Sequence, residues 1–260
     1  MTDTSLRSPA AAMTGDAKPT VVVQDLHVRY RVYATGKAAK DRAGLLKRSP
    51  AMRRVREVHA LRGVSFTAYE GEAIGVIGHN GSGKSTLLKT IAGLTYAAQG
   101  AVWADSDPTL LGVHAAMMNE LSGERNVILG GLALGLTPEE IRAKYDDIVN
   151  FADIGEFIDL PMRTYSSGMA ARLRFAIAAS VSHRVLLIDE ALAVGDKAFQ
   201  RRSEERILEL RQHAGTVFLV SHALNAVLDT CDRALWIDHG LLKMDGPAPD
   251  VVAAYEASVR

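Results

Sequence analysis

The sequence lacks the features that stabilise secreted proteins or hold proteins inside membranes. It contains one cysteine, Cys231, so a disulfide within the chain is impossible. No apolar run approaches the roughly 18 residues that a membrane-crossing helix needs, and residues 1–19 lack the apolar core of a signal peptide. We therefore expect a cytoplasmic protein, or one held at a membrane by a partner, with residues 1–19 as a flexible tail.

Length and periodicity favour an α/β fold. The 260 residues, 48% of them hydrophobic, suffice for one large domain or two small ones. Short apolar runs alternate with segments of helical spacing, which is typical of a mainly parallel sheet with helices around it. Strands are expected at 21–30, 58–69, 73–77, 100–103, 109–113, 185–189 and 216–220. Residues 115–183 are expected to form an inserted helical subdomain, with a helix capped by Thr137 and a later helix at 168–182.

The strongest motif is a glycine-rich loop between the strand at 73–77 and an expected helix. Residues 78–86 contain the motif G-x-x-x-x-G-K-[ST], whose backbone N–H groups surround phosphate oxygens at a helix N-terminus. Lys84 is expected to reach the β- and γ-phosphates, and Ser85 to bind Mg²⁺. A chance glycine-rich turn is the alternative, and the flanking strand and helix argue against it. The predicted phosphate-binding residues are Gly78, His79, Asn80, Gly81, Ser82, Gly83, Lys84, Ser85 and Thr86.

Two carboxylates follow the apolar run that ends at residue 188. In a phosphate-loop protein, the first acid at such a strand end can hold Mg²⁺ through water, which assigns that role to Asp189. Glu190 comes next and is placed to polarise an attacking water as a general base. Taken alone, Asp-Glu after an apolar run also fits the start of an exposed turn, and the phosphate loop favours the metal site.

Two more segments are candidates for phosphate contacts. Ser166 and Ser167 precede Gly168 and can cap the next helix, which makes either an anion site or simply a capped helix. His222 follows the strand at 216–220, where a structural role and a contact to a γ-phosphate are both open.

Charge is unevenly distributed although the formal net charge is zero. Residues 29–62 hold eleven Lys or Arg and two acids, so this segment carries about +9 and the remainder about −9. Such a block suggests a polyanion or an anionic lipid surface as partner, and a solvated linker is the alternative.

In their order, these motifs resemble the ATP-binding subunit of an ABC transporter over about residues 20–245. The resemblance implies a P-loop NTPase core of the ABC ATPase type with an inserted helical subdomain and an antiparallel β subdomain, spanning 20–260. It also implies a homodimer that encloses two ATP molecules, with the segment Ser166–Gly168 of each copy facing its partner's phosphate loop. Glu190 would then be the catalytic base, and His222 would contact the γ-phosphate.

Three segments resemble the polysaccharide-exporting branch of that family. They are Tyr165-Ser166-Ser167-Gly168-Met169, the stretch 121–126, and a basic insertion at 31–57, which in those exporters forms a helix near the membrane. The resemblance implies an ATPase that powers export of a lipid-linked polysaccharide through a separate integral membrane permease, at the cytoplasmic face of the bacterial inner membrane. An ATPase of another ABC importer or exporter is the alternative. Nucleic acid is not expected as a partner, and the chain resembles the branch's short form.

Two positions depart from the family or stay open. The family has a glutamine between the phosphate loop and the helical subdomain, but residues 112–117 contain none, and His114 is the candidate substitute. For stacking on adenine, Tyr30 is the first candidate and Tyr33 the second, and a tyrosine in the core of the strand is the alternative for Tyr30.

Overall fold

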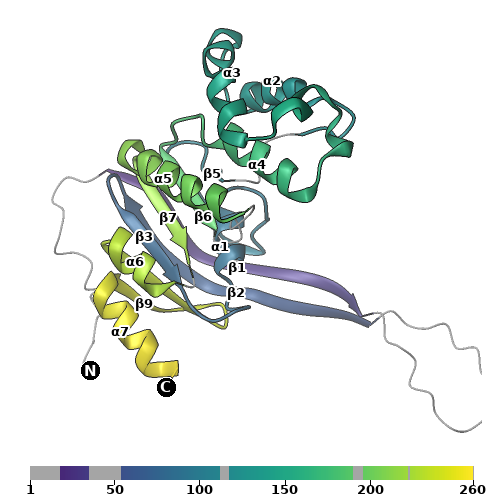
Figure 1. Cartoon of the computed structure of the whole chain (residues 1–260). Helices are drawn as coiled ribbons and strands as arrows, with labels where there is room; N and C mark the ends of the chain where they lie inside the picture. The colour runs from purple at the N-terminus through teal and green to yellow at the C-terminus, as the bar shows by residue number, and fades with distance from the viewer. Residues whose placement is uncertain (1–17, 35–53, 112–116, 190–195, 222, 260) are drawn as a thin grey trace, which may run out of the picture.

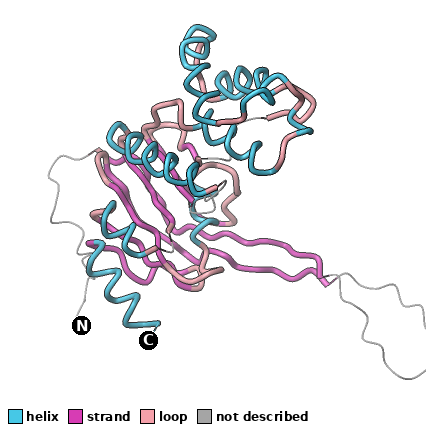
Figure 2. Tube along the Cα trace, viewed as in Figure 1, coloured by secondary structure: helices cyan, strands magenta, loops and turns pink. Residues whose placement is uncertain are grey.

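The structure is a computed structural model that describes residues 18–34, 54–111, 117–189, 196–221 and 223–259. They form two sheets, with helices around the larger one and a separate group of helices at one end (Figure 1, Figure 2). The predicted α/β class is therefore confirmed. Glu190, His222 and His114 lie outside the described residues, as does most of the predicted N-terminal tail.

The larger sheet has six strands in the order β5-β6-β7-β3-β8-β9. Its strands are β3 (Ala73–Ile77), β5 (Thr109–Leu110), β6 (Val185–Asp189), β7 (Thr216–Val220), β8 (Arg233–Asp238) and β9 (Leu241–Pro247). Neighbours pair in parallel except β8 and β9, which pair antiparallel. Because parallel strands present their carboxyl ends at one edge, the ends of β3 and β6 lie on the same side of the sheet.

The smaller sheet is antiparallel, in the order β2-β1-β4. Its strands are β1 (Pro19–Ala34), β2 (Arg54–Tyr69) and β4 (Gln99–Ala104). The far halves of β1 and β2 project from the body as a two-stranded arm (Figure 2). We expected the basic insertion at 31–57 to interrupt the strand, yet its two ends are strand: Arg31 pairs with Glu57 and Val32 with Arg56. The β-branched and aromatic residues at 32 and 33 favour this extension, and residues 35–53 lie outside the described chain.

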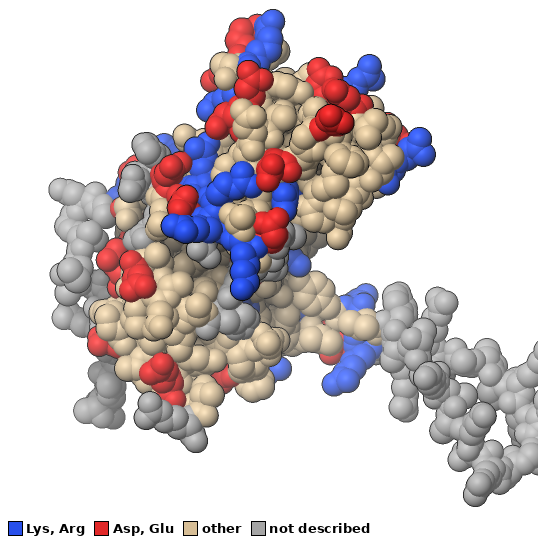
Figure 3. Space-filling model, in the orientation of Figure 1, with Lys and Arg blue, Asp and Glu red and all other residues tan. Residues whose placement is uncertain are grey.

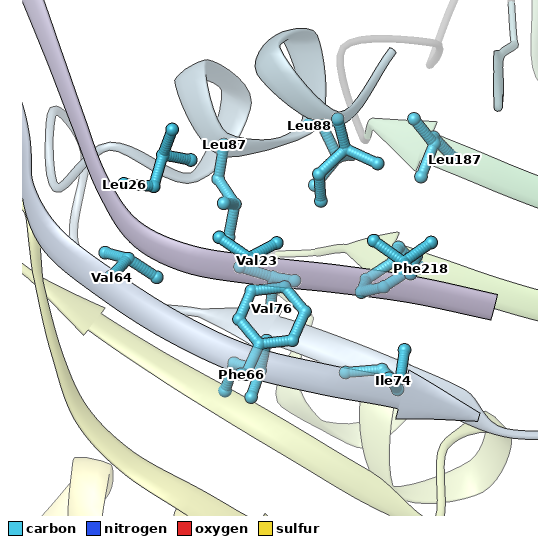
Figure 4. Packing of buried hydrophobic residues seen from close by; sticks show 14 of the residues in the cluster. Val23, Leu26, Val64, Phe66, Ile74, Val76, Leu87, Leu88, Leu187 and Phe218 are labelled. Carbon is cyan, nitrogen blue, oxygen red and sulfur yellow. The ribbon is translucent and has the colours of Figure 1, made fainter. Parts of the chain in front are cut away.

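Helix α1 (Lys84–Ile91) lies between the two sheets and supplies part of the main core. Leu87 and Leu88 are fully buried, and Figure 4 shows them directed toward strands of both sheets. Strand residues alternate between faces, so Ile74 and Val76 face this core while Ala73 and Ile77 pack against the other side of the sheet. Helix α1 is therefore held between residues of the larger sheet and residues of the smaller sheet.

The remaining helices form two groups. Helices α6 (Leu224–Thr230) and α7 (Ala248–Val259) pack on the β3–β8 face, and α5 (Lys197–His213) packs on β6 and β7. Helices α2 (Gly123–Ala133), α3 (Pro138–Ala152) and α4 (Ser167–Ala178) surround a separate apolar cluster (Figure 1). This group occupies the region predicted as a helical subdomain, and α4 ends four residues earlier than predicted.

The predicted cap of α3 is confirmed. The Thr137 hydroxyl accepts a hydrogen bond from the Glu140 backbone N–H, and the Glu140 carboxylate accepts one from the Thr137 N–H at 2.8 Å. The second bond, followed by that from the Thr137 hydroxyl, lowers the pKa of Glu140 below its ordinary value. Both interactions satisfy backbone donors that a helix start leaves open.

Candidate functional site

The phosphate-binding loop joins the buried strand β3 to α1, as the sequence predicts. Gly78 and Gly83, at its two ends, have φ angles of 143° and 116°, in the range that favours glycine. A Cβ atom on Gly78 would lie 2.1 Å from the Ile237 carbonyl oxygen, and one on Gly83 would lie 2.8 Å from the Ala60 carbonyl oxygen. The loop is therefore clamped between β8 and β2, and only glycine fits at these two positions.

A cavity of about 640 Å³ opens over this loop. Its wall includes Lys84 and Ser85 from the start of α1 and Asp189 from the end of β6. Three residue types that bind phosphate and Mg²⁺ thus face one space, although Asp189 is distant in sequence. The parallel sheet explains the meeting, because β3 and β6 end at the same edge.

Lys84 is held at the mouth of the loop. Its side chain is largely buried, with 6% of the residue exposed, and its ammonium donates hydrogen bonds to the carbonyl oxygens of Gly78 at 2.7 Å and His79 at 3.0 Å. A buried ammonium is stable when carbonyl oxygens or anions surround it. Its position at the cavity wall makes it available to an anionic ligand there.

The residues present fit a nucleoside triphosphate with Mg²⁺. Among the described residues, the hydroxyl of Ser82 is buried and has no hydrogen-bond partner, but Ser82 is not part of the cavity wall. The Ser85 hydroxyl and the Asp189 carboxylate are oxygen ligands of the kind that Mg²⁺ prefers. Asn80, Gly81, Gly83 and Thr86 also line the cavity.

The segment Ser166–Gly168 opens α4 and does not contribute to the wall of this cavity among the described residues. The Ser166 hydroxyl accepts a hydrogen bond from the Met169 N–H at 3.2 Å, so it caps the helix as predicted. Ser166 and Ser167 are exposed. The N-terminus of α4, where these two serines lie, is therefore open to a ligand or to another molecule.

The cavity has a second wall that the sequence analysis did not identify. It consists of residues from β2 together with the turn after β8: Val58, His59, Ala60, Arg62 and His239. The positive charge of segment 29–62 suggested an anionic partner, so the strand in this segment was not predicted to line a cavity. Apolar and aromatic groups on a strand that runs beside a phosphate loop are the signal that could have found this wall.

His59 is the aromatic residue that β2 contributes to this wall. Burial, followed by the charge of Arg29, lowers the pKa of His59 below its ordinary value of 6.5, so its ring is neutral at pH 7. Tyr30 lies on the neighbouring strand, pairs with Val58 and is 37% exposed. Directly opposed residues share a sheet face, so Tyr30 remains a neighbour of the cavity.

An ion pair joins α4 to the start of α5. The Arg172 guanidinium contacts the Asp196 carboxylate and lies 5.2 Å from the centre of the Phe199 ring. A hydrogen bond from the Phe199 N–H, followed by the charge of Arg172, lowers the pKa of Asp196. The helix that carries Ser166–Gly168 is thus linked to the start of α5.

Among the described residues, no helix is both long and apolar enough to cross a membrane.

Two relatives named for polymer export match the sequence. A teichoic acids export ATP-binding protein, TagH of Lactococcus lactis, is 40% identical over 224 residues, covering 86% of this chain and 48% of the relative. An O-antigen export system ATP-binding protein, RfbB of Myxococcus xanthus, is 42% identical over 203 residues, covering 78% of this chain and 46% of the relative. The chain thus spans about half the length of these relatives.

Solved structures share the fold. An ATP-binding subunit of an ABC transporter has a TM-score of 0.68 and 21% identity, covering 91% of this chain and 93% of that one. The ATP-binding cassette MJ0796, described as dimeric and bound to ADP and phosphate, has a TM-score of 0.64 and 20% identity, covering 88% of this chain and 98% of that one. The predicted ABC ATPase fold is confirmed.

The family model described as ABC transporter matches residues 61–193, from β2 past the end of β6. That span includes the phosphate loop, the segment Ser166–Gly168 and Asp189. With the relatives above, the match confirms the resemblance inferred from the motifs. The chain belongs to the ABC transporter family.

Proposed function

We propose that this chain hydrolyses ATP to power export of a lipid-linked polysaccharide through a separate membrane permease. The observation that carries the proposal is the meeting of Lys84, Ser85 and Asp189 on one cavity over a phosphate loop. This set provides a cation for the phosphates and two oxygen ligands for Mg²⁺.

Each residue has a chemical role in this proposal. Lys84 neutralises the β- and γ-phosphates, and Ser85 and Asp189 hold Mg²⁺ directly or through water. The bound ion would offset charge that develops on the phosphate oxygens. Glu190 accepts a proton from the attacking water, and His222 orients the γ-phosphate. The position of Glu190 in the sequence, directly after Asp189, supports its role as the base.

The ATP site requires a second copy of the chain. Ser166 and Ser167 are exposed at a helix N-terminus, apart from the cavity of their own copy. Such a terminus attracts anions, so facing the partner's loop would bring it to the γ-phosphate. The dimeric description of the related cassette supports this arrangement.

The adenine base has two candidate stacking partners. His59 lines the cavity and carries a neutral ring at pH 7, which suits stacking without an added charge. Tyr30, the residue that the sequence favours, shares the face of Val58. We place His59 first because its ring belongs to the cavity wall.

Export of a lipid-linked polysaccharide is supported by the names of the relatives and by the basic arm. Figure 3 shows Lys and Arg gathered toward the far end of the β1–β2 arm, where Arg29, Arg31 and Arg56 are exposed. Each basic residue near an anionic surface contributes about 1 kcal/mol. We infer that the arm lies at the cytoplasmic face of the bacterial inner membrane, near the anionic head group of the exported lipid.

Replacing Glu190 with Gln should preserve ATP binding and lower hydrolysis by at least about 100-fold, because the water loses its base while the phosphate clamp remains. Nucleotide affinity, single-turnover hydrolysis and surface glycan in cells that carry only the variant are the measurements. Hydrolysis within about threefold of wild type would show that Glu190 is not the base. If the Glu190→Gln variant loses hydrolysis as expected but cells that carry only this variant still export glycan normally, the transport role alone is refuted.

Replacing Ser167 with Arg should prevent ATP-dependent dimer formation, because a long cation at the start of α4 cannot fit against a partner's phosphate loop. Light scattering of the Glu190→Gln protein with ATP, with and without this change, measures it. Ser258→Arg is the matched control, since Ser258 is exposed on the distant helix α7. Equal dimer content in the Ser167→Arg and control samples would count against the shared site.

Replacing His59 with Ala should weaken ATP binding by at least about fivefold, the lower end of about 1–3 kcal/mol for a stacked base. His59→Phe should retain the affinity, and Tyr30→Ala should change it by less than about twofold. Titration with ATP and with inorganic triphosphate separates base contacts from phosphate contacts. A loss confined to Tyr30→Ala would assign stacking to Tyr30 instead.

A further inference from the structure

We propose that His79, Asp238 and His239 form a binding site for a transition-metal dication, distinct from the Mg²⁺ expected with ATP. His79 Nε2 lies 3.1 Å from Asp238 Oδ1, and His239 Nε2 lies 3.8 Å from the same oxygen. One ligand atom from each residue falls within 4.8 Å of the others. Within the ranges that the structure describes, no other group of three such residues meets this condition.

The contacts of His79 fix which ring nitrogen faces Asp238. Its Nδ1 lies 2.7 Å from the Asn80 carbonyl oxygen, which can only accept, so Nδ1 carries a proton. The other ring nitrogen, Nε2, faces the Asp238 carboxylate at 3.1 Å and is the atom that would bind a metal ion. An N–H bonded to a backbone carbonyl is also the usual arrangement for a metal-binding histidine.

Two of the three separations between ligand atoms are close to those of a metal site. With bond lengths of about 2.0–2.1 Å, two ligands of a tetrahedral zinc ion lie about 3.3–3.4 Å apart. The separation of 3.1 Å between His79 and Asp238 is close to this value, and that of 3.8 Å between Asp238 and His239 needs a shift of a few tenths of an ångström. His239 is 73% exposed at its side chain, so it has room for this shift.

The three residues are held together by backbone contacts that need no metal. His79 belongs to the phosphate loop, and Asp238 ends β8. The Gly240 N–H donates to the Ser82 carbonyl oxygen at 2.8 Å, which ties the turn after β8 to the loop. The rings of His79 and His239 have centroids 4.6 Å apart. The site is thus largely formed before an ion binds.

Ligand chemistry identifies the class of ion. Two imidazoles and one carboxylate favour Zn²⁺, Co²⁺ or Ni²⁺ over Mg²⁺, which prefers oxygen ligands. Lys243 Nζ lies 3.8 Å from Asp238 Oδ2, on the carboxylate oxygen that does not face His79. Oδ1 therefore remains directed at both histidines, and water can complete the coordination on the exposed side.

A second histidine cluster provides the contrast. His27 Nδ1 lies 3.1 Å from His59 Nε2, and His27 Nε2 lies 3.2 Å from Asp25 Oδ1. This group has similar composition, but its three residues do not offer one ligand atom each within 4.8 Å of the others, so it serves as the matched control.

The test is Zn²⁺ binding to the full chain, freed of metal and without nucleotide, by competition with a chromophoric chelator. We expect one high-affinity equivalent per chain, and Co²⁺ should give visible absorption bands typical of nitrogen ligands. His239→Asn should weaken Zn²⁺ binding by at least about tenfold, and asparagine tolerates the φ of 47° at this position. Asp238→Asn should do the same with little change of shape.

His27→Asn and Ser85→Ala are the controls, and both should bind Zn²⁺ as the wild type does. Far-UV circular dichroism and thermal unfolding confirm that each variant is folded. Wild-type affinity in both His239→Asn and Asp238→Asn would overturn the proposal, as would loss of binding in His27→Asn. Loss in Ser85→Ala would place the ion in the nucleotide site instead. The result does not depend on the proposed transport function, because neither nucleotide nor export enters the measurement.

Discussion

The structure depends on the close approach of the phosphate loop to backbone groups of two other segments. The two terminal glycines of the loop meet carbonyl oxygens of β8 and β2 at distances that exclude a Cβ atom. The turn after β8 adds hydrogen bonds, because Gly240 donates to Ser82 O and accepts from the Arg62 N–H, both at 2.8 Å. These contacts fix the loop between the two sheets and give the cavity its second wall.

This packing also connects stability with chemistry. Helix α1 leaves the loop with Lys84 at the cavity, and its next turn buries Leu87 and Leu88 between the sheets. The same short segment therefore anchors the main core and directs the ammonium. A further link, from Arg172 to Asp196, joins α4 to the start of α5.

Much of the fold and part of the site could be predicted from sequence, because local signals determine them. The strands at 73–77, 185–189 and 216–220 are short apolar runs, and the structure has them at those bounds. The length of β1 and the wall formed by Val58 and His59 could not be predicted, because both depend on pairing between strands distant in sequence. The cluster of His79 with Asp238 joins residues 159 positions apart, so no local pattern marks it.

The most direct test of the central claim compares the ATP affinity of Gly83→Ala with that of Gly135→Ala. Both glycines have φ in the left-handed range, 116° and 86°, but only Gly83 would bring its Cβ against backbone, while Gly135 has nothing within 4 Å. The backbone strain is thus shared and the packing differs. If the clamped loop is the nucleotide site, Gly83→Ala weakens ATP binding by at least about tenfold, which is about 1.4 kcal/mol, and Gly135→Ala leaves it unchanged. Wild-type affinity in folded Gly83→Ala protein would contradict the account.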